Sequence, residues 1–362
     1  MASTAAKENE STPKPQSKSS ASTPPRRPLL THLNADTTWL LSLPIPYSKL
    51  TNNRLYKHIL IDPWLRGGQS DVAWYFSQQW HATPSACQSI GDVERIIQAI
   101  EATAAEDPPG LVDGELISLK QDSHAPDKIG NYIDAVIVSH EFTDHMHKDT
   151  LMELPPQVPV FASTKAAYII RSWKRFDTVL EIPRFEGDWR KSSISPLPEW
   201  VGISRVAYAG ADMLYYHSAV MIAFSSGGEE GEAVLYTPHG ISPADVAPVA
   251  EAKPKLRTLA LLHGLQDINL GAQLNMGAHN GLKVQRLLRA RYWIGTHDEV
   301  KNGGGIVSWF LNRKMISLQE AIEREKVERE ADGRGSMKGT EFDSLADLRF
   351  REVENGQLVI LE

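Results

Sequence analysis

Short apolar runs alternate with amphipathic segments through the first half of the chain. The apolar runs predict buried strands, at 39–43, 58–62, 133–138, 158–161 and 178–182. Several of the segments between them carry apolar residues at helical spacing and predict helices, at 92–106, 149–154 and 164–173. Strands that alternate with helices indicate a layered α/β protein.

The pattern changes to consecutive strands after about residue 194 and later returns to alternation. Further strands are predicted at 213–224, 233–236, 256–262 and 292–295, with a loop over 225–231, and further helices at 280–290 and 317–330. The second helix begins at a capping box formed by Ser317 and Glu320. Asn355-Gly356 predicts a hairpin between strands at 350–354 and 357–361. An aromatic-rich stretch at 71–79 predicts a short helix or a lid.

The N-terminal 28 residues differ in composition from the rest. They consist mainly of serine, threonine, proline and lysine, with little to bury, and predict a disordered tail over 1–28. They lack the apolar core of a signal peptide. Cys87 is the only cysteine, which excludes internal disulfides and cysteine-rich zinc sites. We expect a cytoplasmic protein, with nuclear access or mitochondrial import left open.

The overall composition narrows the class of protein and of partner. With 362 residues, 41% of them hydrophobic and 23% charged, the chain has the composition of a soluble globular protein with a sizeable core. A formal net charge of -7 disfavours a nucleic-acid surface, which needs a basic patch. No apolar run reaches the length of about 18 residues that a membrane helix requires. We therefore expect a small-molecule substrate, no nucleic acid and no membrane insertion, with the oligomeric state open.

Candidate metal ligands gather directly after the predicted strand 133–138. Residues 139–147 read Ser-His-Glu-Phe-Thr-Asp-His-Met-His, so that His140, Asp144 and His145 fall in one loop. Many hydrolases build a metal site in this way, with imidazole and carboxylate ligands at the carboxyl end of a buried strand. His147 is a weaker candidate, because it is expected to lie on the following helix and to point elsewhere.

Other polar side chains fall where a strand gives way to a loop. His217 lies within a predicted strand, whereas His239 and His297 each follow one, and the three are further candidate ligands. Asp62 precedes Pro63 and is either a turn residue or a carboxylate that orients the metal-site loop from behind.

Two more histidines are candidates for proton transfer. His263 ends a predicted strand and His279 lies at a helix start. Each can equally be a hydrogen-bonded turn residue. Gly303-Gly304-Gly305 lacks the Lys-Ser/Thr tail of a phosphate-binding loop and is interpreted as a flexible loop at the rim of a pocket.

The stretch 139–145 resembles the His-x-His-x-Asp-His signature of the metallo-β-lactamase superfamily. Asp62 resembles the first motif of that family, and His217, His239 and His297 follow in the order of its later motifs. The resemblance covers roughly residues 33–362. Over this range the sequence is similar to uncharacterised fungal members of the superfamily. It implies a four-layer αββα sandwich formed by one domain over 29–362, with the metal site at one edge between two sheets.

Two departures from the family pattern change the expected metal content. Phe142 stands where the family has its second histidine, and His239 stands where an acidic residue usually bridges two metals. A neutral imidazole binds one ion, whereas a carboxylate can bridge two. The resemblance therefore implies one well-held ion at Asp144, His145 and His297, with His239 as a further candidate ligand. It implies a second site at His140 and His217 that is weak or absent. Zinc is the expected metal, with iron or manganese as alternatives.

Three functions are compatible with these residues. The first is a metal-dependent hydrolase that uses a metal-activated water, with Asp144 and His263 as catalytic residues. The second is a catalytically degenerate binding or scaffold protein with the same fold, which Phe142 and His239 motivate. The third is an iron-dependent oxidoreductase that uses the same ligands. The sequence does not identify the substrate or the bond that is cleaved.

Overall fold

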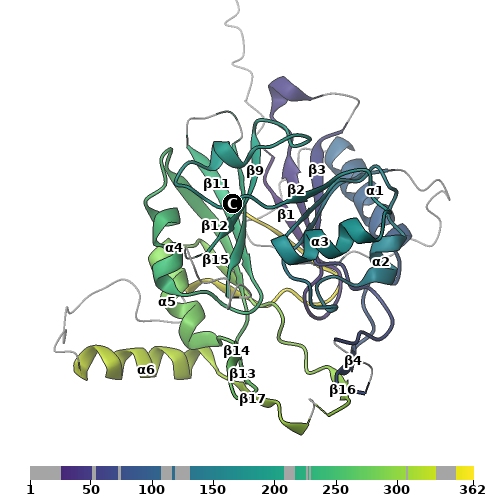
Figure 1. The fold of residues 1–362 in the computed structure, drawn as a ribbon. Helices are drawn as coiled ribbons and strands as arrows, with labels where there is room; N and C mark the ends of the chain where they lie inside the picture. The colour runs from purple at the N-terminus through teal and green to yellow at the C-terminus, as the bar shows by residue number, and fades with distance from the viewer. Residues whose placement is uncertain are drawn as a thin grey trace, which may run out of the picture.

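Two large sheets dominate the computed structural model (Figure 1). It describes residues 26–50, 54–71, 75–106, 116–118, 131–207, 217–225, 227, 230–306, 309–331 and 348–362. The first sheet has the order β5-β19-β1-β2-β3-β6-β7-β8, with bounds Leu116–Ser118, Gln357–Ile360, Leu29–His32, Trp39–Pro44, Tyr56–Ile61, Ile133–Val138, Val160–Ala162 and Val179–Glu181. The second has the order β18-β15-β12-β11-β10-β9, with bounds Phe350–Arg351, Tyr292–Ile294, Leu256–His263, Gly231–Thr237, Ala219–Phe224 and Val201–Val206.

Helices cover the outer faces of both sheets (Figure 1). The first sheet carries α1 (Ile90–Glu106), α2 (Lys148–Met152) and α3 (Thr164–Ser172), and the second carries α4 (Pro243–Ala250) and α5 (Ala278–Leu288), against which α6 (Leu318–Ala331) packs. Two short 3-10 helices span Tyr47–Lys49 and Trp189–Ser192. Small sheets are formed by β14 (Gln273–Asn275), β13 (Gln266–Asn269) and β17 (Asn312–Met315), and by β16 (Asn302–Gly304) and β4 (Gln78–Trp80).

Alternate side chains of the first sheet enter two different cores. In β3, Ile59 and Ile61 pack between the sheets, against residues of the second sheet such as Ile222. Leu60 points the other way, into the core shared with α1, α2 and α3. Both faces of these strands are therefore buried, which explains why they appear in the sequence as continuous apolar runs. The predicted four-layer αββα sandwich is confirmed.

The structure corrects the predicted C-terminal hairpin. Gly356 has a φ of 87° and the chain turns there, with the amide of Gln357 donating to the carbonyl of Glu354 at 2.9 Å. The two flanking strands, however, join different sheets, because β18 pairs with β15 whereas β19 pairs with β1 and β5. Val353 between them is buried in the core that separates the sheets. The turn thus carries the chain from one layer to the other.

Two glycine-rich or aromatic segments also differ from expectation. Within the aromatic stretch 71–79, the described residues form a turn and the start of β4, which contradicts the predicted helix but not the alternative of a lid. Two of the three glycines at 303–305 belong to β16, which pairs with β4 in antiparallel register. Residues 1–25 of the predicted tail lie outside the described residues. No helix in the described ranges combines the length and the apolar character needed to cross a membrane.

Candidate metal centre

The loop after β6 is held by a carboxylate at the end of the neighbouring strand β3. Asp62 has a φ of 44°, a backbone conformation that aspartate tolerates better than most residues. Its Oδ1 atom accepts from the amide of Ser139 at 2.7 Å, and its Oδ2 atom accepts from the Ser139 hydroxyl. Oδ2 also lies 2.7 Å from Nδ1 of His145. Because β3 and β6 are parallel, their carboxyl ends meet at one edge of the sheet, and Asp62 lies beneath the loop.

Three histidines form the first group of candidate ligands. His140, His145 and His239 each offer a ring nitrogen within 4.8 Å of the others, and all three are buried. His239 follows β11 in the second sheet, so the group spans both sheets. The Nε2 atoms of His145 and His239 are 3.1 Å apart. The His140 and His239 rings are stacked at 4.6 Å between centroids.

A second group shares His145 with the first. Asp144, His145 and His297 also place ligand atoms within 4.8 Å of one another and are all buried. Nε2 of His145 is 3.8 Å from Oδ1 of Asp144, and Nε2 of His297 is 3.9 Å from Oδ2. His297 follows β15 and adopts a φ of 60°, a strained conformation for a residue other than glycine.

Hydrogen bonds from behind select the nitrogen that each ring presents. Nδ1 of His145 donates to Asp62, and Nδ1 of His239 faces Oδ1 of Asn275 at 2.8 Å. Nδ1 of His297 lies 3.1 Å from Oδ1 of Asp36. In each neutral ring the Nε2 lone pair then points into the centre, the arrangement that metal-binding histidines require.

The donor set fits a divalent transition metal. Ligands at about 2.0–2.1 Å from a tetrahedral ion lie about 3.3 Å apart. The 3.1 Å separation of the His145 and His239 Nε2 atoms is close to this value. Two lone pairs at such a distance repel unless a proton or a metal ion lies between them. Nitrogen and oxygen donors suit zinc, iron and manganese alike.

The charge state of the histidines follows from burial and from the nearby carboxylates. Burial lowers the pKa values of His140 and His239 well below their usual range, and the neighbouring histidines add to this effect. Both are therefore neutral at pH 7. Burial also disfavours the charged form of His145, but Asp144 and Asp62 outweigh it and raise the pKa of His145. Their charge would equally stabilise a metal ion bound at this ring.

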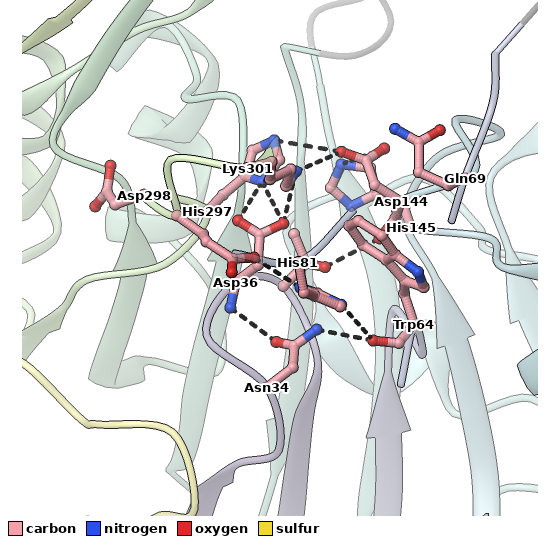
Figure 2. Close-up of polar contacts among 12 residues, drawn as sticks. Asn34, Asp36, Trp64, Gln69, His81, Asp144, His145, His297, Asp298 and Lys301 are labelled. Atoms are coloured by element: carbon pink, nitrogen blue, oxygen red, sulfur yellow. Dashed lines mark hydrogen bonds and ion pairs between the residues drawn. The ribbon is translucent and has the colours of Figure 1, made fainter. Parts of the chain in front are cut away.

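Two charged residues that sequence reasoning missed complete the site. Asp36 lies in the turn between β1 and β2, and Lys301 lies four residues after His297 (Figure 2). Lys301 Nζ is 2.7 Å from Oδ2 of Asp36 and 2.9 Å from Oδ2 of Asp144. Burial raises the pKa of Asp144, but Lys301 and His145 outweigh it and hold that pKa well below its usual range. Asp36 and Lys301 have no local sequence signal, because a charged residue in a loop is usually solvated.

The other predicted site residues lie outside both groups. His217 precedes β10 rather than lying within a strand, and its ring nitrogens face the main-chain carbonyls of His239 and Gln273 at 3.2 Å each. His263 is buried, with Nδ1 at 2.7 Å from the carbonyl of Gly264 and Nε2 at 2.8 Å from Oδ1 of Asn280. His147 caps α2 through the amide of Thr150.

A cavity of about 310 Å³ opens onto the centre. Asp144, His239, His297 and Lys301 line its polar end, and Phe142, Ile268 and Leu270 line apolar walls. The ring of Phe142 lies against His140, with 5.3 Å between the centroids. The volume is at the lower end of the range of about 300–1,000 Å³ found for small-molecule sites.

The structure is similar to several solved structures at low sequence identity. One is a possible metal-dependent hydrolase from Veillonella parvula, with 13% identity, a TM-score of 0.49 and coverage of 92% of this chain and 100% of that one. Another is an isothiocyanate hydrolase from Delia radicum gut bacteria, with 15% identity, a TM-score of 0.45 and coverage of 91% and 97%. A third is a novel metallo hydrolase from the archaeon Ignicoccus hospitalis, with 13% identity, a TM-score of 0.43 and coverage of 92% and 98%.

Neither a protein-family model nor a curated protein matches the sequence. Similarity at these identities concerns architecture alone. Any activity therefore has to be argued from the residues of the site.

Proposed function

We propose that the protein is a metal-dependent hydrolase of a small molecule, with one zinc ion as its expected metal. The observation that carries the proposal is the convergence of two buried ligand groups, joined at His145, on one cavity. Buried ionisable groups are costly unless they are paired or bind a ligand. Four histidines and an aspartate from both sheets, gathered at the edge of the sandwich, favour a ligand that they hold together.

The ion is proposed to bind at His140, His145 and His239, whereas the family resemblance implied Asp144, His145 and His297 as the well-held site. Asp144, a member of the second group, already forms an ion pair with Lys301, whereas His140, His145 and His239 offer three buried imidazoles within 4.8 Å of one another. A bound divalent ion would lower the pKa of a coordinated water to about 7 and polarise the bond that is cleaved. His140, His145 and His239 would hold the ion, and the cavity lined by His239 would admit the water and the substrate.

The surrounding residues supply orientation and proton transfer. Asp144 lines the cavity next to His145, and its carboxylate can accept a hydrogen bond from a water and so orient it. Phe142 and the apolar walls exclude bulk water and favour a substrate with an apolar part. The predicted proton-transfer role of His263 gains no support from its position, because both of its ring nitrogens face oxygen atoms away from the cavity.

Metal content tests this proposal directly. Protein purified without added metal or chelator should contain one ion per chain by elemental analysis. His239→Ala should weaken zinc binding by more than about 100-fold, which exceeds the loss expected when only a hydrogen-bond partner of a ligand is removed. The same variant should no longer hydrolyse a panel of nitrophenyl esters and phosphodiesters. His297→Ala should weaken binding less. The matched control for zinc affinity is His279→Ala, which removes a histidine outside both ligand groups. Full zinc affinity in the His239→Ala variant would contradict the ligand assignment.

A second candidate function is a binding protein without catalysis. The observation in its favour is Phe142, whose ring takes the place of a ligand beside His140. This candidate predicts that the folded protein is purified without a stoichiometric metal. Elemental analysis of the wild-type chain therefore separates the two candidates.

A further inference from the structure

A buried lysine lies in the middle of the candidate metal centre. The side chain of Lys301 is 4% exposed, and its Nζ atom contacts Asp36 at 2.7 Å and Asp144 at 2.9 Å. Nζ also lies 3.4 Å from Nδ1 of His297 and 5.5 Å from the centroid of the Trp64 ring. Figure 2 shows the ammonium between the two carboxylates. A lysine this deeply buried is stable as a cation only because acidic partners surround it.

The turn between β1 and β2 is built to present one of these partners. Oδ1 of Asn34 accepts from the amides of Asp36 and Thr38 at 2.9 Å each, which closes a tight turn and directs the Asp36 side chain upward to Lys301 (Figure 2). Asp36 is completely buried and also contacts His297. The contacts from Asp36 and Asp144 hold the ammonium in one place.

The ammonium competes with a metal ion for the same carboxylate. An ion bound to Asp144 would lie about 2.0–2.2 Å from one of its oxygens. Lys301 already lies 2.9 Å from Oδ2 of that carboxylate. A divalent ion and an ammonium on one carboxylate repel strongly in a buried site, where the effective dielectric constant is low. Lys301 therefore already supplies the positive charge that a metal ion would bring to the group Asp144, His145 and His297.

We propose that Lys301 is a fixed internal cation that stands in for a second metal ion and limits the centre to one ion, held by His140, His145 and His239. This inference rests on the proposed metal-dependent function and adds a positioning residue to it. Lys301 neutralises Asp144, keeps it beside the shared ligand His145, and presents a positive charge to the cavity, which it also lines. A second ion would supply the same charge at this place.

Removal of the charge should create a second metal site. In Lys301→Met, a side chain of similar length without charge leaves Asp36 and Asp144 as two buried carboxylates beside His145 and His297. Such a set of donors attracts a divalent cation. Lys301→Arg keeps the charge and should keep the single site. Lys283→Met is the matched control, because Lys283 is an exposed lysine that pairs with Glu328 on the surface.

Cobalt and zinc titration of the metal-free chain counts the sites without reference to activity. Visible absorption of Co²⁺ and elemental analysis after dialysis against Zn²⁺ should give one ion for wild type, Lys301→Arg and Lys283→Met, and two ions for Lys301→Met. Circular dichroism checks folding, and the smaller Lys301→Ala substitution serves as a second neutral variant. Two ions in the wild type, or one ion in both folded neutral variants, would overturn the role of Lys301 and leave the metal-dependent function intact. A wild-type chain without any ion would overturn both proposals.

Discussion

Oδ2 of Asp62 lies 2.7 Å from Nδ1 of His145, and this contact decides which nitrogen of His145 faces the centre. Both side chains are completely buried. Asp62 also accepts from the amide and the hydroxyl of Ser139, so one carboxylate orients the ring and anchors the loop that carries it. His145 is the only residue common to the two ligand groups found in the described part of the chain.

The first prediction follows from this pairing. Asp62→Asn keeps the shape of the side chain but removes the charge that strengthens His145 as a ligand. Contacts of this kind typically contribute about 10–100-fold in metal affinity. We therefore expect zinc binding about 10–100-fold weaker, measured by competition with a chelator. Asp188→Asn, which alters an exposed ion pair with Arg190, is the control. Unchanged affinity in the Asp62→Asn variant would show that the charge does not act on the metal.

A second prediction concerns the phenylalanine beside the three-histidine group. Phe142 lies 5.3 Å from His140 and 6.2 Å from His239 between ring centroids. Phe142→His would add an imidazole at this position and should tighten zinc binding by about tenfold or more, because a fourth nitrogen replaces water as a ligand. Phe142→Leu keeps the position apolar and should leave the affinity unchanged. Equal affinities of the two variants would place the ion away from residue 142.

A third prediction concerns stability and pH, at a histidine outside both ligand groups. His32 is stacked on Trp39 at 3.9 Å between centroids, and its Nδ1 donates to the carbonyl of Val353 at 2.7 Å. Burial lowers the pKa of His32 to about 4, although the carbonyls of Val353 and Asp36 oppose this effect. Between pH 6.5 and pH 4 the unfolded chain therefore binds the proton more readily than the folded chain. The stability that the neutral His32 contributes is fully present above pH 6.5 and is lost as the pH falls toward 4.

Urea unfolding at pH 7 and pH 5 measures this contribution. Proton uptake by His32 in the unfolded chain should lower the free energy of unfolding by about 2 kcal/mol from pH 7 to pH 5. His32→Phe keeps a ring on Trp39 but cannot take up a proton, so its stability should fall by about 2 kcal/mol less than that of the wild type over the same interval. Equal losses in the two proteins would mean that His32 does not titrate on unfolding in this range.

Strands with two buried faces were predictable from the sequence. The run at 133–138 and the observed strand β6 coincide, because the side chains on either face of this strand enter a core and nearly every position must be apolar. The helix start at Ser317 was predictable as well, since the amide of Glu320 donates to the Ser317 hydroxyl at 3.1 Å through local geometry alone. The Glu320 carboxylate, which the predicted capping box would use, pairs with Lys314 instead. The turn at Gly356 was local too, but the sheets that its flanking strands join depend on distant partners.

The same division holds for the candidate site. The sequence determined that His140, Asp144 and His145 share one loop after a buried strand, and that His239 and His297 each follow a strand. The tertiary structure decided that all five meet, that His145 belongs to two groups, and that His217 and His263 lie outside both. The tertiary structure alone decided the role of Lys301, because the sequence predicts that an isolated lysine in a loop is solvated. Asp36 comes from the other end of the chain, and together with Asp144 it pairs with the buried Lys301 ammonium.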